Sequence, residues 1–254
     1  MRIRVMVVVL LTAVVATERV STQTSHVVRG LDGSWEAYPV RGDGFGSGVP
    51  AKTAVKAPPP IPEPPLKQPH LDEWRAAQRQ ATELSQKGLP PVSTGMACIP
   101  EGMPGMMQVT FPMEIIESPG RITIIQEAYN QVRRVYLDAK PIAPEDAEPL
   151  FAGHSTGTWE GDTLVVRTVG IKEPVRFRNT PHSSVMRITE RMRLVNSEIL
   201  ENQVTVEDPE YLTKPWTWTW MYKRWPDYKI EEYVCEDNRY FEDPVLKYQR
   251  LRVQ

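Results

Sequence analysis

From residue 111 onward, apolar and polar residues alternate with a period of two in a series of short segments. Such alternation, with β-branched and aromatic residues at the apolar positions, is typical of half-buried β-strands. Turn residues such as Ser-Pro-Gly (118–120) and Glu-Gly-Asp (160–162) separate the segments. The predicted strands are 111–117, 121–127, 132–138, 155–160, 163–170, 185–194, 199–207, 216–222 and 230–235. An earlier short strand is predicted at Gly33-Ser34-Trp35.

One segment follows a helical period instead. Leu71, Trp74, Ala81 and Leu84 recur at helical spacing, and Gly88 can end the helix, so we predict a helix over 70–87. With about ten strands in hairpin succession and a single helix, the predicted fold is mainly all-β, an antiparallel lipocalin-like β-barrel.

The first part of the chain differs in composition. Most of the 24 prolines precede residue 105. Residues 1–16 combine Arg2 and Arg4 with a short apolar run, which is typical of a secretory signal peptide; an uncleaved membrane anchor is the alternative. We expect a Pro/Gly-rich extension over 17–69 and a barrel domain over 70–254. The expected location is periplasmic or secreted, without membrane attachment after signal removal.

Charge and cysteine content narrow the possible classes of protein further. The net charge of −2 gives no general attraction to nucleic acid. Cys98 and Cys235 are the two cysteines, and in an exported chain they are expected to form a disulfide. A Cys/His metal site is the alternative.

Histidines in two predicted loops are the candidates for chemistry. His154 and His182 each precede a serine and lie beside predicted strands. A histidine can transfer protons near neutral pH, so both are candidate catalytic residues, with Ser183 and Glu190 beside them. Structural histidines bound to loop carbonyls are the alternative. No serine lies in a G-x-S-x-G turn, which argues against a serine hydrolase.

Aromatic and basic residues could form a substrate pocket. Trp216 and Trp218 share one strand face, as either core or the wall of a cavity. An arginine could hold an anionic group of a small organic molecule. For Arg191 a cross-strand ion pair is the alternative. The candidate substrate-binding residues are Arg178, Arg191, Trp159, Trp216, Trp218, Tyr211 and Tyr136.

Several motifs in fixed order resemble a family of uncharacterised exported bacterial proteins. The most specific is GHSTGTWEGDTLVVRTVG at 153–170. The others are the CIPEGMP loop (98–104), the strand pair at 113–120, RRVYLD (133–138), the PHS…ER segment (181–191), DPEYLTKPW (208–216) and EYVCEDN (232–238). The resemblance covers roughly residues 60 to 240. The chain departs from it at 176–179, where Arg-Phe-Arg-Asn replaces a common aspartate and glycine.

Three functions are compatible with these patterns. The first is an exported lyase, isomerase or hydratase that uses His154 and His182 in a Trp-lined barrel cavity, without a redox cofactor. The second is a periplasmic lipocalin-like ligand-binding protein. The third is a metal protein that uses the two histidines with a carboxylate. No nucleotide-binding glycine motif is present, so no cofactor is expected.

Overall fold

The structure is a computed structural model that describes residues 29–40, 46–53, 55–89, 98–235, 240–242 and 249–251. The predicted signal peptide, residues 1–16, lies outside the described residues. No helix within the described residues is long and apolar enough to cross a bilayer.

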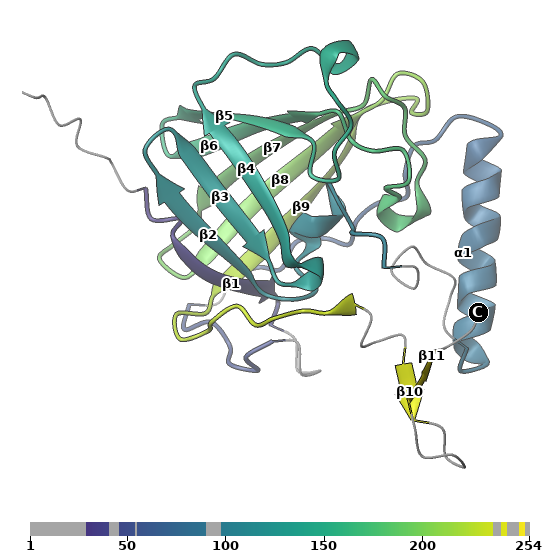
Figure 1. The fold of residues 1–254 in the computed structure, drawn as a ribbon, viewed down its shortest axis with the longest axis horizontal. Helices are drawn as coiled ribbons and strands as arrows, with labels where there is room; N and C mark the ends of the chain where they lie inside the picture. Colours follow the sequence, from purple (N-terminus) through teal and green to yellow (C-terminus); the bar gives the residue numbers. More distant parts are fainter. Residues whose placement is uncertain are drawn as a thin grey trace, which may run out of the picture.

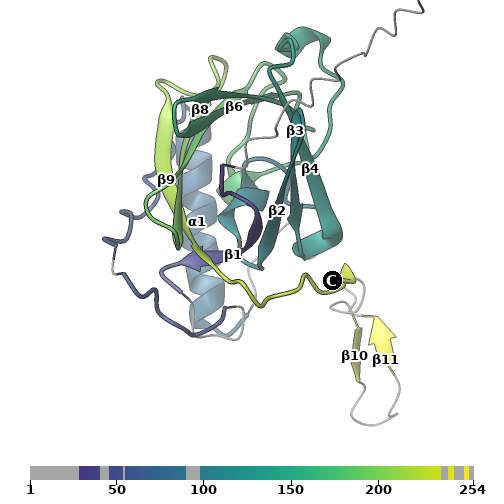
Figure 2. The ribbon, with the colours of Figure 1, turned by 90° about the vertical axis from the view of Figure 1, so that its left-hand side faces the viewer.

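Nine strands form a closed barrel in which each strand pairs with its neighbours in the sequence and β9 returns to β1 (Figures 1 and 2). This confirms the predicted mainly-β barrel. The strands are β1 (Gly33–Tyr38), β2 (Met113–Ser118), β3 (Arg121–Gln126), β4 (Gln131–Leu137), β5 (His154–Glu160), β6 (Thr163–Val169), β7 (Arg187–Leu194), β8 (Ile199–Glu207) and β9 (Trp216–Arg224). Outside the barrel, β10 (Tyr240–Glu242) pairs with β11 (Gln249–Leu251).

One strand pair departs from the predicted antiparallel order. Strand directions cannot alternate around a ring with an odd number of strands, so a nine-stranded barrel needs at least one parallel pair. That pair is β4–β5. The connection over 138–153, which includes the short 3-10 helix η4 (Pro144–Asp146), returns the chain to the end of the barrel at which β4 begins. The pairing covers only residues 135–137 of β4, so residues 131–134 have no β5 neighbour.

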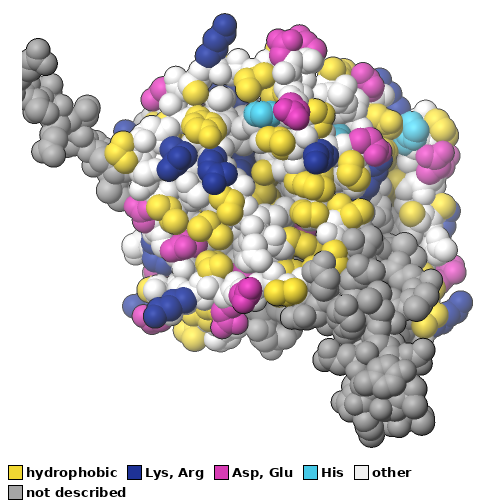
Figure 3. Space-filling view, in the orientation of Figure 1, with side chains coloured by type: hydrophobic (Ala, Val, Ile, Leu, Met, Phe, Trp, Pro, Cys, Tyr) yellow, Lys and Arg dark blue, Asp and Glu magenta, His cyan; other side chains and the backbone are white. Residues whose placement is uncertain are grey.

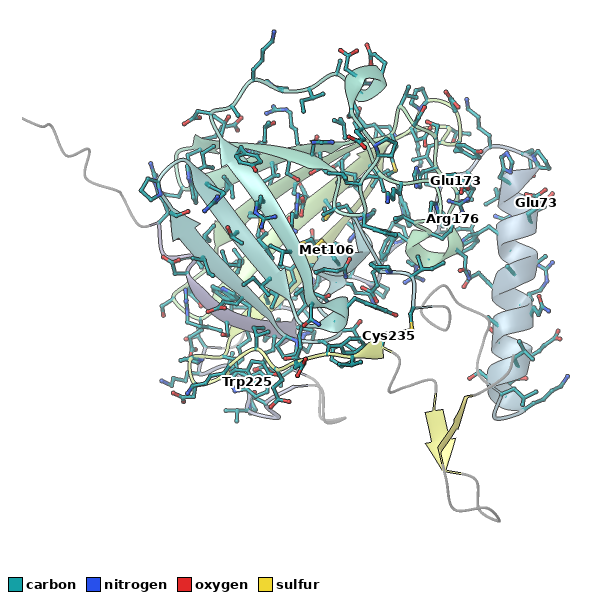
Figure 4. The ribbon with its side chains drawn as sticks, in the orientation of Figure 1. Glu73, Met106, Glu173, Arg176, Trp225 and Cys235 are labelled. Atoms are coloured by element: carbon teal, nitrogen blue, oxygen red, sulfur yellow. A yellow bond between two sulfur atoms is a disulfide. The ribbon has the colours of Figure 1, made fainter. Side chains whose placement is uncertain are left out.

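The barrel interior is filled by side chains. Alternate residues of every strand point inward, and a short 3-10 helix, η2 (Gly105–Gln108), inserts methionines between them. Met103, Met106 and Met107 are completely buried, and Figure 4 shows Met106 inside the barrel wall. Flexible thioether chains suit this irregular space.

The helix α1 (His70–Gln86) lies at one side of the barrel and agrees with the predicted segment (Figure 1). Gly88 follows it with φ of +70°. None of its side chains is fully buried. Leu71 and Trp74 pack against the core, and the Trp74 indole donates to the Arg178 carbonyl at 2.8 Å. The helix is therefore anchored through its N-terminal half.

The strand predicted at 230–235 is wrong, because this segment has no strand pairing in the structure. It runs past the barrel as irregular chain and ends at Cys235, which is bonded to Cys98. The predicted disulfide is confirmed. Asn130 donates to the Tyr233 carbonyl at 2.7 Å, so the segment is held by contacts with the 3-10 helix η3 (Ala128–Asn130) and not by a sheet.

Candidate functional site

A cavity of about 780 Å³ lies on the outer face of the barrel, between strands β4 to β8 and the connection over 138–153. We call it the outer groove. Its floor comes from outward-facing residues of β4, β5, β6 and β7, and its roof from the connection, including Lys140, Ile142 and Leu150. Inward-facing Ser155 and Thr168 also reach it, next to the part of β4 that β5 leaves unpaired.

Strand register places the floor residues next to one another. Tyr136 pairs with Thr156, Thr156 with Arg167, and Arg167 with Thr189. Paired residues point to the same face of a sheet with their Cβ atoms about 5 Å apart. Arg167 therefore lies between two threonines, Thr156 and Thr189, on the floor of the groove.

The groove concentrates basic side chains that make no ion pair among the described residues. Arg134, Lys140, Arg167 and Arg187 line it and are exposed, and none of them makes an ion pair among the described residues. Glu207, the register partner of Arg187 on β8, is the one carboxylate among the described residues of the lining. Elsewhere on the barrel surface, Arg191 pairs with Glu160 at 3.0 Å and Arg193 with Glu201 at 2.8 Å. The groove is therefore a positively charged site.

Apolar side chains lie among these charges. Val132 is 40% exposed, Tyr136 50%, Ile142 42% and Leu150 42%, and all four line the groove. Figure 3 shows hydrophobic and basic side chains mixed on the face that carries β4 and β5. Large exposed apolar groups that gather around one cavity mark a binding surface more often than single ones do.

His154 is the predicted catalytic residue that lines the groove. Its Nε2 lies 2.8 Å from the carbonyl oxygen of Glu148 in the roof. A carbonyl only accepts hydrogen bonds, so Nε2 carries the proton and Nδ1 of the neutral ring is an acceptor. A Cβ on Gly170 would lie 3.2 Å from Cδ2 of the ring, so this edge is also packed. Nδ1 has no partner among the described residues.

His182 lies elsewhere. It lines a separate cavity of about 20 Å³, and its ring nitrogens lie 3.0 and 3.1 Å from the carbonyls of Ser183 and Lys172. Ser183 is buried and donates its hydroxyl to Asp208 at 2.9 Å and its backbone N–H to the same carboxylate at 2.7 Å. The structure therefore does not bring the two histidines to one cavity, and the contacts of His182 and Ser183 hold loops together.

Glu190 is fully buried inside the barrel. Its carboxylate is bonded to the Arg133 guanidinium and accepts from Asn202 Nδ2 at 2.9 Å. Arg133 also donates to Thr168 at 2.9 Å and to Ser155 at 3.1 Å. The pKa of the neighbouring Tyr222 phenol is raised, mainly by burial. This cluster organises the interior beneath the groove and leaves Glu190 out of reach of a ligand.

The tryptophans predicted to wall a cavity belong to the core. Trp216 and Trp218 are buried and contact Phe177, with ring centroids 5.8 and 5.2 Å from it. Trp216 lines the small cavity, and no tryptophan is among the described residues that line the outer groove. Trp159 lies under the guanidinium of Arg29, 5.0 Å from its carbon.

The remaining predicted substrate-binding residues are dispersed. Tyr211 contacts the His70 ring at 4.9 Å, and Arg191 is engaged by Glu160. Arg178 is exposed, with φ of 52°, on the 3-10 helix η5 (Phe177–Asn179). Of the predicted set, the groove combines Tyr136 with His154.

The sequence interpretation missed the arginines of the groove. Arg134, Arg167 and Arg187 occupy the outward positions of β4, β6 and β7, which the alternation alone could have identified. The approach of Arg134 to the other two could not be identified, because it depends on the parallel β4–β5 pair. No group of three or more His, Cys, Asp or Glu side chains that could hold a metal is found among the described residues.

No model of a protein family matches this chain, and no curated protein matches it.

Proposed function

We propose that this protein binds a small organic anion with an apolar body in the outer groove. The observation that supports this most is the gathering of four basic side chains, which make no ion pair among the described residues, around exposed apolar ones in a cavity of about 780 Å³. That volume falls within the range of roughly 300–1,000 Å³ usual for small-molecule sites.

The chemistry of the groove fits such a ligand. A carboxylate can accept two parallel hydrogen bonds from one guanidinium, and Arg167 is available for this on the groove floor, with a threonine on each neighbouring strand. The apolar body would cover Val132, Tyr136, Ile142 and Leu150, which water now contacts. Binding would remove this apolar surface from water and place the anion against positive charge.

Isothermal titration calorimetry with 3-phenylpropanoate and its uncharged amide tests the proposal. We expect the acid to bind and the amide to bind much more weakly. Arg167→Gln should weaken binding of the acid about 10- to 100-fold, the usual effect of losing a charged hydrogen-bond partner. Arg193→Gln is the matched control, because Arg193 is paired with Glu201 and lies outside the groove. Equal affinity for acid and amide, or equal losses in both variants, would refute the proposal.

An acid–base enzyme in the same groove is the second candidate, supported by the unpartnered Nδ1 of His154. A single base beside a bound acid could remove a proton from it. Turnover of a bound acid by the wild type, lost in His154→Gln while binding is kept, would support an enzyme. Binding without turnover would support a binding protein and not an enzyme.

Export is part of the proposal. The apolar segment within residues 1–16, the Cys98–Cys235 disulfide and the motif resemblance support a periplasmic or secreted protein. N-terminal sequencing of protein from the periplasm or medium should begin near residue 17, whereas recovery with Met1 intact from the cytosol would contradict export.

A further inference from the structure

The ring of His154 offers the outer groove a hydrogen-bond acceptor among many donors. The groove arginines, Lys140 and the ring's own Nε2–H all donate, while Nδ1 of the neutral ring can only accept. The Cδ2 edge packs toward Gly170 and Nε2 is bonded to the Glu148 carbonyl, so the Nδ1 edge is the one left for a ligand.

The position of this acceptor relative to Arg167 limits what can reach it. Thr156 is the register partner of Arg167, and His154 lies two residues before Thr156 on the same face of β5. Two residues along a strand span about 7 Å. Arg167 and His154 are therefore diagonal neighbours on β6 and β5, and a ligand whose carboxylate is held by Arg167 would have the atoms next to it on the side of the His154 ring.

We propose that the natural ligand is a hydroxy acid, and that His154 selects it by accepting a hydrogen bond from the hydroxyl beside the carboxylate; this rests on the proposed anion-binding function. An ammonium group could also donate to Nδ1. However, a second positive charge among Arg134, Arg167, Arg187 and Lys140 is electrostatically unfavourable. A neutral O–H donor meets no such repulsion.

Three probes that differ at one position test this in the full-length protein at pH 8. They are 3-phenyllactate, which has the hydroxyl; 3-phenylpropanoate, which lacks it; and 2-methoxy-3-phenylpropanoate, which has the oxygen without a donor. Calorimetry should show 3-phenyllactate binding about three- to tenfold more tightly than 3-phenylpropanoate, the usual effect of one neutral hydrogen bond. The methoxy acid should show no such gain.

Two variants separate the two nitrogens of the ring. His154→Gln places an amide nitrogen where Nε2 lies, so it keeps the bond to the Glu148 carbonyl and loses the acceptor. His154→Asn places its amide group near Nδ1 and keeps an acceptor there. The preference for 3-phenyllactate should disappear in His154→Gln and survive in His154→Asn.

The outcomes separate this inference from the proposed function. If the three acids bind the wild type equally, and Arg167→Gln still weakens them, the groove binds anions but His154 does not select hydroxy acids. A preference that persists in His154→Gln overturns the inference in the same way. If no acid binds, or Arg167→Gln has no effect, the proposed function fails and this inference fails with it.

Discussion

Arg133 and Glu190 form an ion pair inside the barrel, from β4 to β7, strands that are not neighbours in the sheet. The Arg133 side chain is 1% exposed and the Glu190 side chain 0%. Arg133 is one of residues 131–134, which have no neighbour on β5. Its ion pair therefore connects β4 to β7 where backbone pairing between β4 and β5 is absent. The motif segments RRVYLD and PHS…ER thus meet at one buried contact.

Loss of one partner of this pair should be strongly destabilising. Glu190→Gln leaves the Arg133 guanidinium buried without a counter-charge, and we expect a loss of about 3–5 kcal/mol in the free energy of unfolding. Urea denaturation followed by tryptophan fluorescence measures it. The neighbouring Arg191→Gln is the control, because it breaks an exposed pair worth at most about 1 kcal/mol. Similar losses in both variants would contradict the buried pair.

The disulfide should stabilise the folded protein by lowering the conformational entropy of the unfolded chain. Cys98 and Cys235 are 137 positions apart, and closing a loop of that length removes unfolded-state entropy worth about 4–5 kcal/mol. We expect the double variant Cys98→Ser, Cys235→Ser to lose about that much in urea denaturation. Dithiothreitol should lower the unfolding midpoint of the wild type and leave that of the double variant unchanged. An unchanged wild-type midpoint after reduction would show that the bond adds no stability.

The strand pattern was predictable from the sequence because alternation reports directly on a sheet with one buried face. The segment predicted at 199–207 coincides with β8, and 216–222 with most of β9. The segment at 230–235 also reads as a strand, but the barrel is closed by pairing of β9 with β1, which leaves no edge for it. Closure is a property of the whole sheet and has no local signal.

The site was less predictable, for a related reason. His154 was recognised by residue type, and Tyr136 by its phenol, but the groove that joins them exists because β4 and β5 run parallel. Buried Glu190 and Ser183 resemble catalytic residues in the sequence, since polar residues on or next to a histidine-bearing segment serve both chemistry and internal bonding. Only the partners, Arg133 and Asp208, distinguish the two roles.

Asp208 should be more important for stability than Ser183. Its carboxylate accepts from Ser183 twice and from the backbone N–H groups of Glu210 and Tyr211 at 3.0 and 3.2 Å. Ser183→Ala removes one of these bonds and should cost about 1 kcal/mol, whereas Asp208→Ala removes all of them and should cost about 3 kcal/mol or more. Urea denaturation measures both losses.

Neither variant should change the affinity for 3-phenylpropanoate, because neither residue lines the outer groove. This comparison separates a structural role of Ser183 from the predicted catalytic one. Loss of ligand binding or turnover in Ser183→Ala, at unchanged stability, would restore the catalytic assignment.

Glu101 should make the fold less stable as the pH rises. It lies on the loop before η2, and its Oε2 is buried without a hydrogen-bond partner. Burial raises the pKa of its carboxyl from 4.5 to about 7. The folded protein therefore keeps a proton that the unfolded chain releases between these values. The stability linked to that proton is complete below about pH 4.5 and is lost as the pH rises through about 7.

Glu101→Gln, which keeps the shape without the charge, isolates this effect. At pH 8 the variant should be more stable than the wild type by at most about 3 kcal/mol, the free energy that corresponds to a pKa of about 7 instead of 4.5. At pH 4.5, where the wild-type carboxyl is protonated in the folded state, the two should be nearly equal. Urea denaturation of both proteins across this range provides the comparison. A stability difference that does not change with pH would show that Glu101 has an ordinary pKa and that water reaches its carboxylate.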